Sequence, residues 1–149
     1  MKTIIHAIAG TLALACVLIF WGATVIAELF TSPDTIALVK QFIVYAMAVL
    51  VPSMTTVAGT GFSLAGARGG RLIDTKKKRM RMIAPNGLFV LLPCAFYLNH
   101  KAGAGEFDAL FYSVQVVELA AGAVNGSLLI LNFRDGLRLG GRLTPQRKS

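Results

Sequence analysis

The amino-acid sequence predicts an all-α membrane protein with four transmembrane helices and both termini in the cytoplasm. Three observations support this fold class: an apolar composition, four long apolar segments joined by short polar ones, and basic residues concentrated in alternate connections. Of the 149 residues, 55% are hydrophobic and 15% are charged, whereas about a quarter of the residues in a soluble domain are charged. We therefore expect one four-helix integral membrane domain that covers residues 1–149.

The first two apolar segments cover about residues 4–27 and 35–65. A helix of about 20 apolar residues crosses the ~30 Å hydrocarbon layer of a bilayer, so both are long enough. The first run exceeds the apolar core of a signal peptide, and we expect it to be a retained helix. The second is longer than a perpendicular crossing needs, and Pro52 predicts a bend in it.

The second half of that segment is rich in small and hydroxylated residues. Such residues let helices approach closely and form hydrogen bonds across the contact. We therefore expect helix packing there, with a solute-lined groove as the alternative. The expected packing residues are Pro52, Ser53, Thr56, Gly59 and Thr60. Near the other end of the segment, Lys40 is expected to reach the lipid headgroups.

A basic loop is predicted over residues 66–82. Short, basic connections between transmembrane helices stay in the cytoplasm, and their cations attract anionic lipid headgroups at about 1 kcal/mol each. Because the charges cluster at the ends of apolar segments, we expect membrane lipid rather than nucleic acid as the partner. The expected headgroup contacts are Arg68, Arg71, Lys76, Lys77, Lys78, Arg79 and Arg81.

The last two helices are predicted at about residues 83–98 and 107–131, followed by a basic tail over 132–149. With both termini inside, thirteen of the 15 Lys and Arg residues lie on the cytoplasmic side. Lys40 and Lys101 are the remaining two. This asymmetry predicts a multi-pass protein of a bacterial plasma membrane, the cell inner membrane.

A polar stripe interrupts the fourth helix, since Gln115, Glu118 and Asn125 fall on one helical face. A charged side chain in the middle of a membrane is expensive and faces the protein interior. With no cation expected at its depth, Glu118 is predicted to be uncharged, and either to hold helices together or to handle protons or a solute. The candidate hydrogen-bond partners of Glu118 are Gln115, Tyr45, Ser53, Thr55 and Thr56.

The sequence contains no spacing typical of a catalytic triad, a nucleotide loop or a metal site. His6 and His100 are predicted at opposite membrane faces, too far apart to share a haem. Cys16 and Cys94 lie in apolar runs and are expected to be reduced. We therefore expect neither catalytic residues nor a metal, and the sequence identifies no cofactor.

Four short helices with little chain outside the membrane leave little room for an enclosed active site. The leading hypothesis is therefore a non-enzymatic subunit or accessory factor of a larger membrane complex, bound to other subunits or to copies of itself. One alternative is a small transporter or proton-coupled carrier that uses the stripe around Glu118. A further alternative is a quinone- or haem-associated electron-transfer subunit.

Overall fold

The computed structural model describes residues 1–66 and 70–140, and this part of the chain consists of helices joined by short connections, without strands. Four helices in it are long and apolar enough to cross a membrane, which confirms the expected all-α, four-helix membrane architecture. Three of the crossing helices are α1 (Lys2–Phe30), α2 (Pro33–Gly66) and α5 (Ala109–Leu139). The third crossing helix in chain order is built from α3 (Arg71–Asn86), η1 (Gly87–Leu91) and α4 (Leu92–Gly103), which follow one another without a break.

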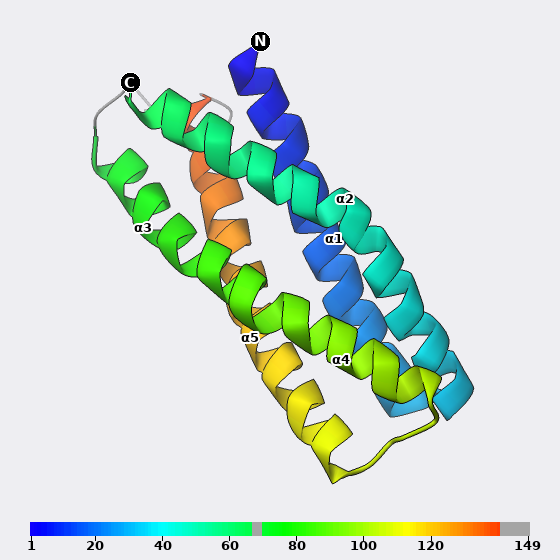
Figure 1. Ribbon diagram of the computed structural model, residues 1–149. Helices are drawn as coiled ribbons and strands as arrows, with labels where there is room; N and C mark the ends of the chain where they lie inside the picture. The colour runs from blue at the N-terminus through cyan, green and yellow to red at the C-terminus, as the bar shows by residue number, and fades with distance from the viewer. Residues whose placement is uncertain (67–69, 141–149) are drawn as a thin grey trace, which may run out of the picture.

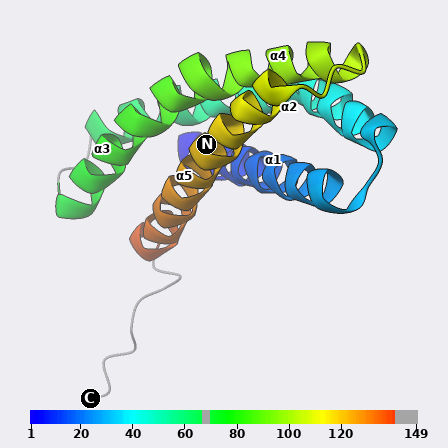
Figure 2. The ribbon, with the colours of Figure 1, turned by 90° about the horizontal axis from the view of Figure 1, so that it is seen from below.

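The helices run alternately up and down (Figure 1). The beginning of α1, the end of α2, the beginning of α3 and the end of α5 lie together, and we call this the terminal end of the bundle. The α1–α2 turn and the α4–α5 connection lie at the opposite, loop end. Seen from below, α3, η1 and α4 form one curved rod (Figure 2).

The predicted basic loop over residues 66–82 is wrong for most of its length, because α3 already begins at Arg71. The third crossing helix therefore covers Arg71–Gly103 instead of 83–98. Lysine, arginine and methionine are good helix formers, and Asp74 stabilises the positive end of the helix dipole in the first turn. A positive φ of 139° at Gly70 separates α3 from the preceding chain.

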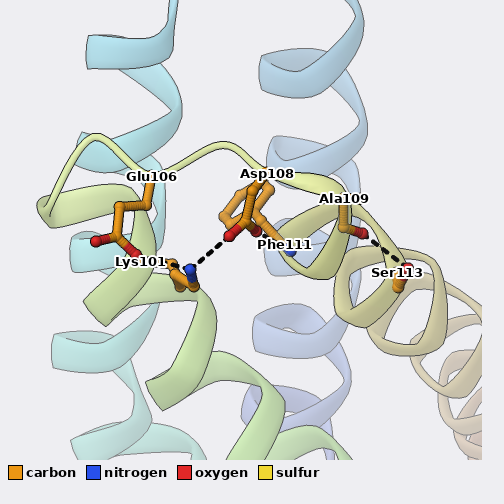
Figure 3. Close-up of polar contacts among 6 residues, drawn as sticks. All are labelled: Lys101, Glu106, Asp108, Ala109, Phe111 and Ser113. Carbon is orange, nitrogen blue, oxygen red and sulfur yellow. Dashed lines mark hydrogen bonds and ion pairs between the residues drawn. The ribbon is translucent and has the colours of Figure 1, made fainter.

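The fourth helix also extends beyond its predicted end, since α5 reaches Leu139 rather than residue 131. The predicted tail is thus helical over 132–139, and its part from residue 141 lies outside the described residues. The start of α5 is fixed by Asp108, whose carboxylate accepts the backbone N–H of Phe111 at 2.8 Å. Asp108 also accepts a hydrogen bond from Lys101 at 2.7 Å (Figure 3). The hydrogen bond from Lys101, and to a smaller extent that from Phe111, holds the pKa of the Asp108 carboxyl below its usual range.

The small and hydroxylated residues of α2 form the predicted helix contact in part, since Ser53 is buried and Thr60 reaches α1. Ser53 and Thr56 donate to carbonyl groups of their own helix, at 2.7 and 2.8 Å, and Pro52 and Gly59 are exposed. Within the predicted set, Thr60 makes the side-chain hydrogen bond to another helix, 2.9 Å from Nδ1 of His6 on α1. Hydroxyl groups of this kind can satisfy carbonyls near a helical proline, and Ser53 bonds to the carbonyl of Val49 beside Pro52, through which α2 continues.

Close packing also involves glycines of α5. A methyl group on Gly122 would lie 3.0 Å from the ring of Trp21, and one on Gly126 would lie 3.7 Å from Leu18. Glycines four residues apart allow this kind of approach between membrane helices. The pair brings α1 against α5, and the sequence analysis did not identify it.

A π-helical turn, η1, separates α3 from α4. It lies between Pro85 and Pro93, neither of which can donate a backbone hydrogen bond. The N–H of Leu92 reaches the carbonyl of Gly87, five residues back. Such turns insert an extra residue, which redirects the side chains on either side and is frequent at functional sites.

Candidate functional site

A buried ion pair joins α2 to α5 in the loop-end half of the bundle. The ammonium group of Lys40 lies 2.7 Å from Oε2 of Glu118, and the two side chains are 1% and 12% exposed. The amide of Gln115 donates to the same carboxylate oxygen at 3.0 Å. An ion pair in a low-dielectric interior needs such additional hydrogen bonds to offset its desolvation.

Glu28 from α1 completes this group, which we call the loop-end cluster: Glu28, Lys40, Gln115 and Glu118. Glu28 lies close enough for the charges of Lys40 and Glu118 to act on its carboxyl group. Its Oε1 atom and Oε1 of Gln115 are buried and have no hydrogen-bond partner among the described residues. Cys94 of α4 also lies within range of the charges of Lys40 and Glu118. The third crossing helix therefore borders the cluster, as α1, α2 and α5 do.

The cluster corrects the expected surroundings of Glu118. Gln115 is a partner as predicted, but Tyr45 is 69% exposed, and Ser53, Thr55 and Thr56 bond to their own helix. The premise that no cation lies at the depth of Glu118 is wrong, and Lys40 is buried rather than extended to the headgroups. The reason for expecting an uncharged Glu118 is therefore removed.

Helix register could have revealed this pair. Lys40 is seven residues from the start of α2 at Pro33, and Glu118 is nine residues from the start of α5 at Ala109. At 1.5 Å per residue both lie about 10–14 Å below the same end of the bundle. Equal depth and opposite charge were thus present in the sequence, but accurate helix starts were needed to see them.

Further along α5, the third stripe residue has a neutral partner. Asn125 is 2% exposed, and its Oδ1 accepts a hydrogen bond from Nδ2 of Asn86 at 2.8 Å. Asn86 also donates to the carbonyl of Ala121 at 2.9 Å. Asn86, which directly precedes η1, therefore holds the third crossing helix against α5.

Trp21 lies between these two polar regions along α5. Its indole N–H donates to the carbonyl of Leu119 at 2.9 Å, and its ring packs on Gly122. The aromatic ring thus fills the interval between Glu118 and Asn125. Trp21 itself remains 40% exposed.

A second ion pair lies towards the terminal end. Arg79 of α3 is 2.6 Å from Oδ2 of Asp135 and donates to Oδ1 of Asn132 at 3.3 Å. Asp135 is 3% exposed, and Arg138 approaches its other oxygen at 3.8 Å. The sequence analysis placed Asp135 in the basic tail. Its ion pair with Arg79 forms because α5 continues past it to Leu139.

The seven residues expected to contact headgroups fall into different environments. Arg71, Lys78 and Arg81 are exposed, Arg79 is engaged with Asp135, and Arg68 lies outside the described residues. The other two, Lys76 and Lys77, face a cavity of about 570 Å³ at the terminal end, which we call the terminal-end cavity.

The terminal-end cavity is lined by α1, α2, α3 and α5, and its polar lining consists of Thr3, His6, Lys76, Lys77 and Asn132. His6 is therefore at the terminal end, whereas His100 is near the end of α4 at the loop end. No group of three or more His, Cys, Asp or Glu residues that could hold a metal occurs in the described part of the chain.

The fold and these sites define an α-helical, multi-pass membrane protein with two buried ion pairs. Comparison of the chain with known proteins found no matching family model, no matching curated protein and no matching solved structure.

Proposed function

We propose that the chain is a small proton-coupled membrane protein of a bacterial inner membrane, with both termini and the terminal end in the cytoplasm. The orientation follows from charge. The terminal end carries the basic residues of α3 and of the end of α5, whereas Lys101 stands beside Glu106 and Asp108 at the loop end. Basic segments stay on the cytoplasmic side.

The observation that carries the proton-coupled function is the charge balance of the loop-end cluster. With every group ionised, Glu28 and Glu118 supply two negative charges and Lys40 supplies one positive charge. A net charge buried within a membrane is expensive, and one bound proton neutralises it. Because Lys40 and Gln115 already bind Glu118, the proton belongs on Glu28, whose Oε1 is unpartnered among the described residues.

The position of the cluster gives the direction of proton access. Glu28 is two residues before the end of α1, so a proton reaches it from the loop end. Trp21 packs on Gly122, between the cluster and Asn125. Transfer across the membrane then requires movement of α1 against α5, which breaks the Trp21 contact.

Infrared spectroscopy and flux measurements test this proposal. A protonated Glu28 should give a carboxylic-acid absorption that Glu28→Gln abolishes, and the same variant should stop acidification of vesicles that contain the protein. Glu106→Gln removes an exposed acid from the same end and should change neither signal. An unchanged infrared band and unchanged flux in Glu28→Gln would exclude the cluster as the proton site.

The subunit hypothesis is the second candidate, and a pair of polar residues on the outer surface of α2 favours it. Gln41 donates to the hydroxyl of Tyr45 at 3.2 Å, and both side chains are exposed. Gln41 is eight residues from Pro33, about 12 Å into the helix, where polar groups face protein rather than lipid. A neighbouring helix, from another subunit or from a second copy, would cover them.

Cross-linking from position 41 in native membranes distinguishes these occupants. In a chain whose own cysteines are replaced by serine, Gln41→Cys should form a homodimer if copies associate, or a product of another defined mass if a different subunit covers α2. Leu88→Cys, on an exposed position of the third crossing helix, is the matched control. Equal, weak cross-linking at both positions would remove this hypothesis.

A further inference from the structure

The terminal-end cavity has an unbalanced positive charge. Lys76 and Lys77 line it, and no acidic residue belongs to its lining. Neither ammonium group is within ion-pair distance of a carboxylate among residues 1–66 and 70–140. The nearby Asp135 acts on Lys76, but it is also bound by Arg79 at 2.6 Å and approached by Arg138 at 3.8 Å, so one acid faces three cations.

Two neutral hydrogen-bonding groups add to this cationic rim. Asn132 uses its Oδ1 to accept from Arg79, which leaves its amide N–H groups free to donate. On the other side, the hydroxyl of Thr60 donates to the carbonyl of Thr56 at 2.5 Å, so it accepts from Nδ1 of His6. Nδ1 of His6 therefore carries a proton, and its Nε2 has no partner among the described residues. The rim therefore offers an anion two cations and the amide donors of Asn132, whereas Nε2 of His6 in this tautomer is an acceptor.

The cavity changes character with depth. Its rim includes Thr3 and Gly140, at the ends of α1 and α5, where the membrane interface lies. It extends down to Gly10, Val57 and Leu129, and Gly10 is eight residues, about 12 Å, from the start of α1. The deeper walls are apolar. A ligand that fills it therefore carries an anionic group at the interface and a hydrocarbon part within the membrane.

We propose that the terminal-end cavity binds an anionic phospholipid, with its headgroup phosphate between Lys76, Lys77 and Asn132 and the upper part of a chain against Val57 and Leu129. Basic pockets between transmembrane helices on the cytoplasmic side are suited to such headgroups. A volume of about 570 Å³ is within the usual range for a ligand site. The site is separate from the loop-end cluster and does not depend on the proton-coupled function.

Native mass spectrometry of the purified full chain, with phosphatidylglycerol or phosphatidylcholine added to the detergent, tests the proposal. The double variant Lys76→Gln/Lys77→Gln should lower the affinity for phosphatidylglycerol about 30-fold, from two headgroup contacts. The matched control, Lys78→Gln/Arg81→Gln, removes the same charge from exposed positions of α3 and should change it less than about threefold. Phosphatidylcholine should bind weakly to all three proteins.

A second variant tests the apolar part of the cavity without changing its charge. Ala58 lines the cavity, and Ala58→Phe should block phosphatidylglycerol while leaving helix content unchanged. Calorimetry with inorganic phosphate alone should show binding at least 100-fold weaker than that of the lipid. The proposal is overturned if the control loses as much lipid affinity as the cavity variant, if neither Ala58→Phe nor the cavity variant loses any, or if phosphate binds as tightly as lipid.

Discussion

The two buried ion pairs of this protein use the same helix, α5, but have opposite charge balance. At the loop end, Lys40 stands against two acids, Glu118 at 2.7 Å and the neighbouring Glu28. Towards the terminal end, Asp135 stands against two bases, Arg79 at 2.6 Å and Arg138 at 3.8 Å. The first region is therefore suited to a proton and the second, with Lys76 and Lys77 nearby, to an anion.

Solvent access differs between the two pairs as well. Lys40 is 1% exposed, whereas the side chain of Arg79 is 18% exposed and begins only eight residues from the start of α3. A long basic side chain near a helix end can reach the headgroups when its partner is removed, but Lys40 has no such route. The difference teaches that burial depth, more than ion-pair distance, decides what each pair contributes.

The largest expected effect is that of Lys40→Met. This substitution leaves Glu118, whose side chain is 12% exposed, without its cation, and loss of one partner of a buried pair costs about 3–5 kcal/mol. Thermal unfolding in detergent, followed by the fluorescence of the single tryptophan, should show a strongly lowered midpoint. Lys40→Met/Glu118→Leu should recover much of the loss. A wild-type midpoint in the single variant would show that the pair is not desolvated.

Asp135→Asn should have a smaller effect on the same unfolding midpoint. The amide keeps a hydrogen-bond acceptor for Arg79, and Arg79 can turn towards the headgroups, so we expect a loss of about 1.5–3 kcal/mol. The control is Arg138→Gln, which removes a 47% exposed partner and should cost less than about 1 kcal/mol. A loss as large as that of Lys40→Met would contradict the proposed difference between the two regions.

Asn86→Leu tests the neutral contact between the two ion pairs. It removes the hydrogen bonds to Asn125 and Ala121, and such bonds in membrane proteins contribute about 1–2 kcal/mol. The unfolding midpoint should therefore fall less than in Asp135→Asn. Ser113→Ala removes an exposed hydroxyl that bonds only within α5, to the carbonyl of Ala109 (Figure 3), and should leave the midpoint nearly unchanged.

The smallest effect is expected at Asp108, where the ion pair with Lys101 is exposed to water. Because folding lowers the pKa of this carboxyl, its contribution is fully present above the unfolded pKa, about 3.9. It is lost as the pH falls below that value through the folded pKa. Asp108→Asn should thus lower the unfolding midpoint slightly at pH 7 and by less at pH 2. An equal difference at both pH values would assign the effect to lost helix capping alone.

The sequence by itself determined the fold class and the approximate positions of four crossing helices. The physical reason is that the thickness of the hydrocarbon layer fixes how long an apolar segment must be. It also placed Gln115, Glu118 and Asn125 on one face of α5, because helical periodicity depends on local geometry alone. Glu118 and Asn125 form polar contacts with other helices. Gln115 bonds to Glu118 within α5.

The helix boundaries could not be predicted from composition. The basic segment from Arg71 onwards and residues 132–139 are too polar to resemble a transmembrane segment, but each is part of a helix that contains one. A helix that extends past the membrane carries charges without losing its backbone hydrogen bonds. That extension is what brings Arg79 to Asp135.

Only the tertiary structure decided which polar groups meet. Lys40 and Glu118 are 78 residues apart in the chain, and their contact depends on the tilt and rotation of α2 and α5, which helix packing sets. The terminal-end cavity likewise exists because four helices surround it at one end of the bundle. Sequence patterns specify the depth of a residue in the membrane, but the partner at that depth depends on how the helices pack.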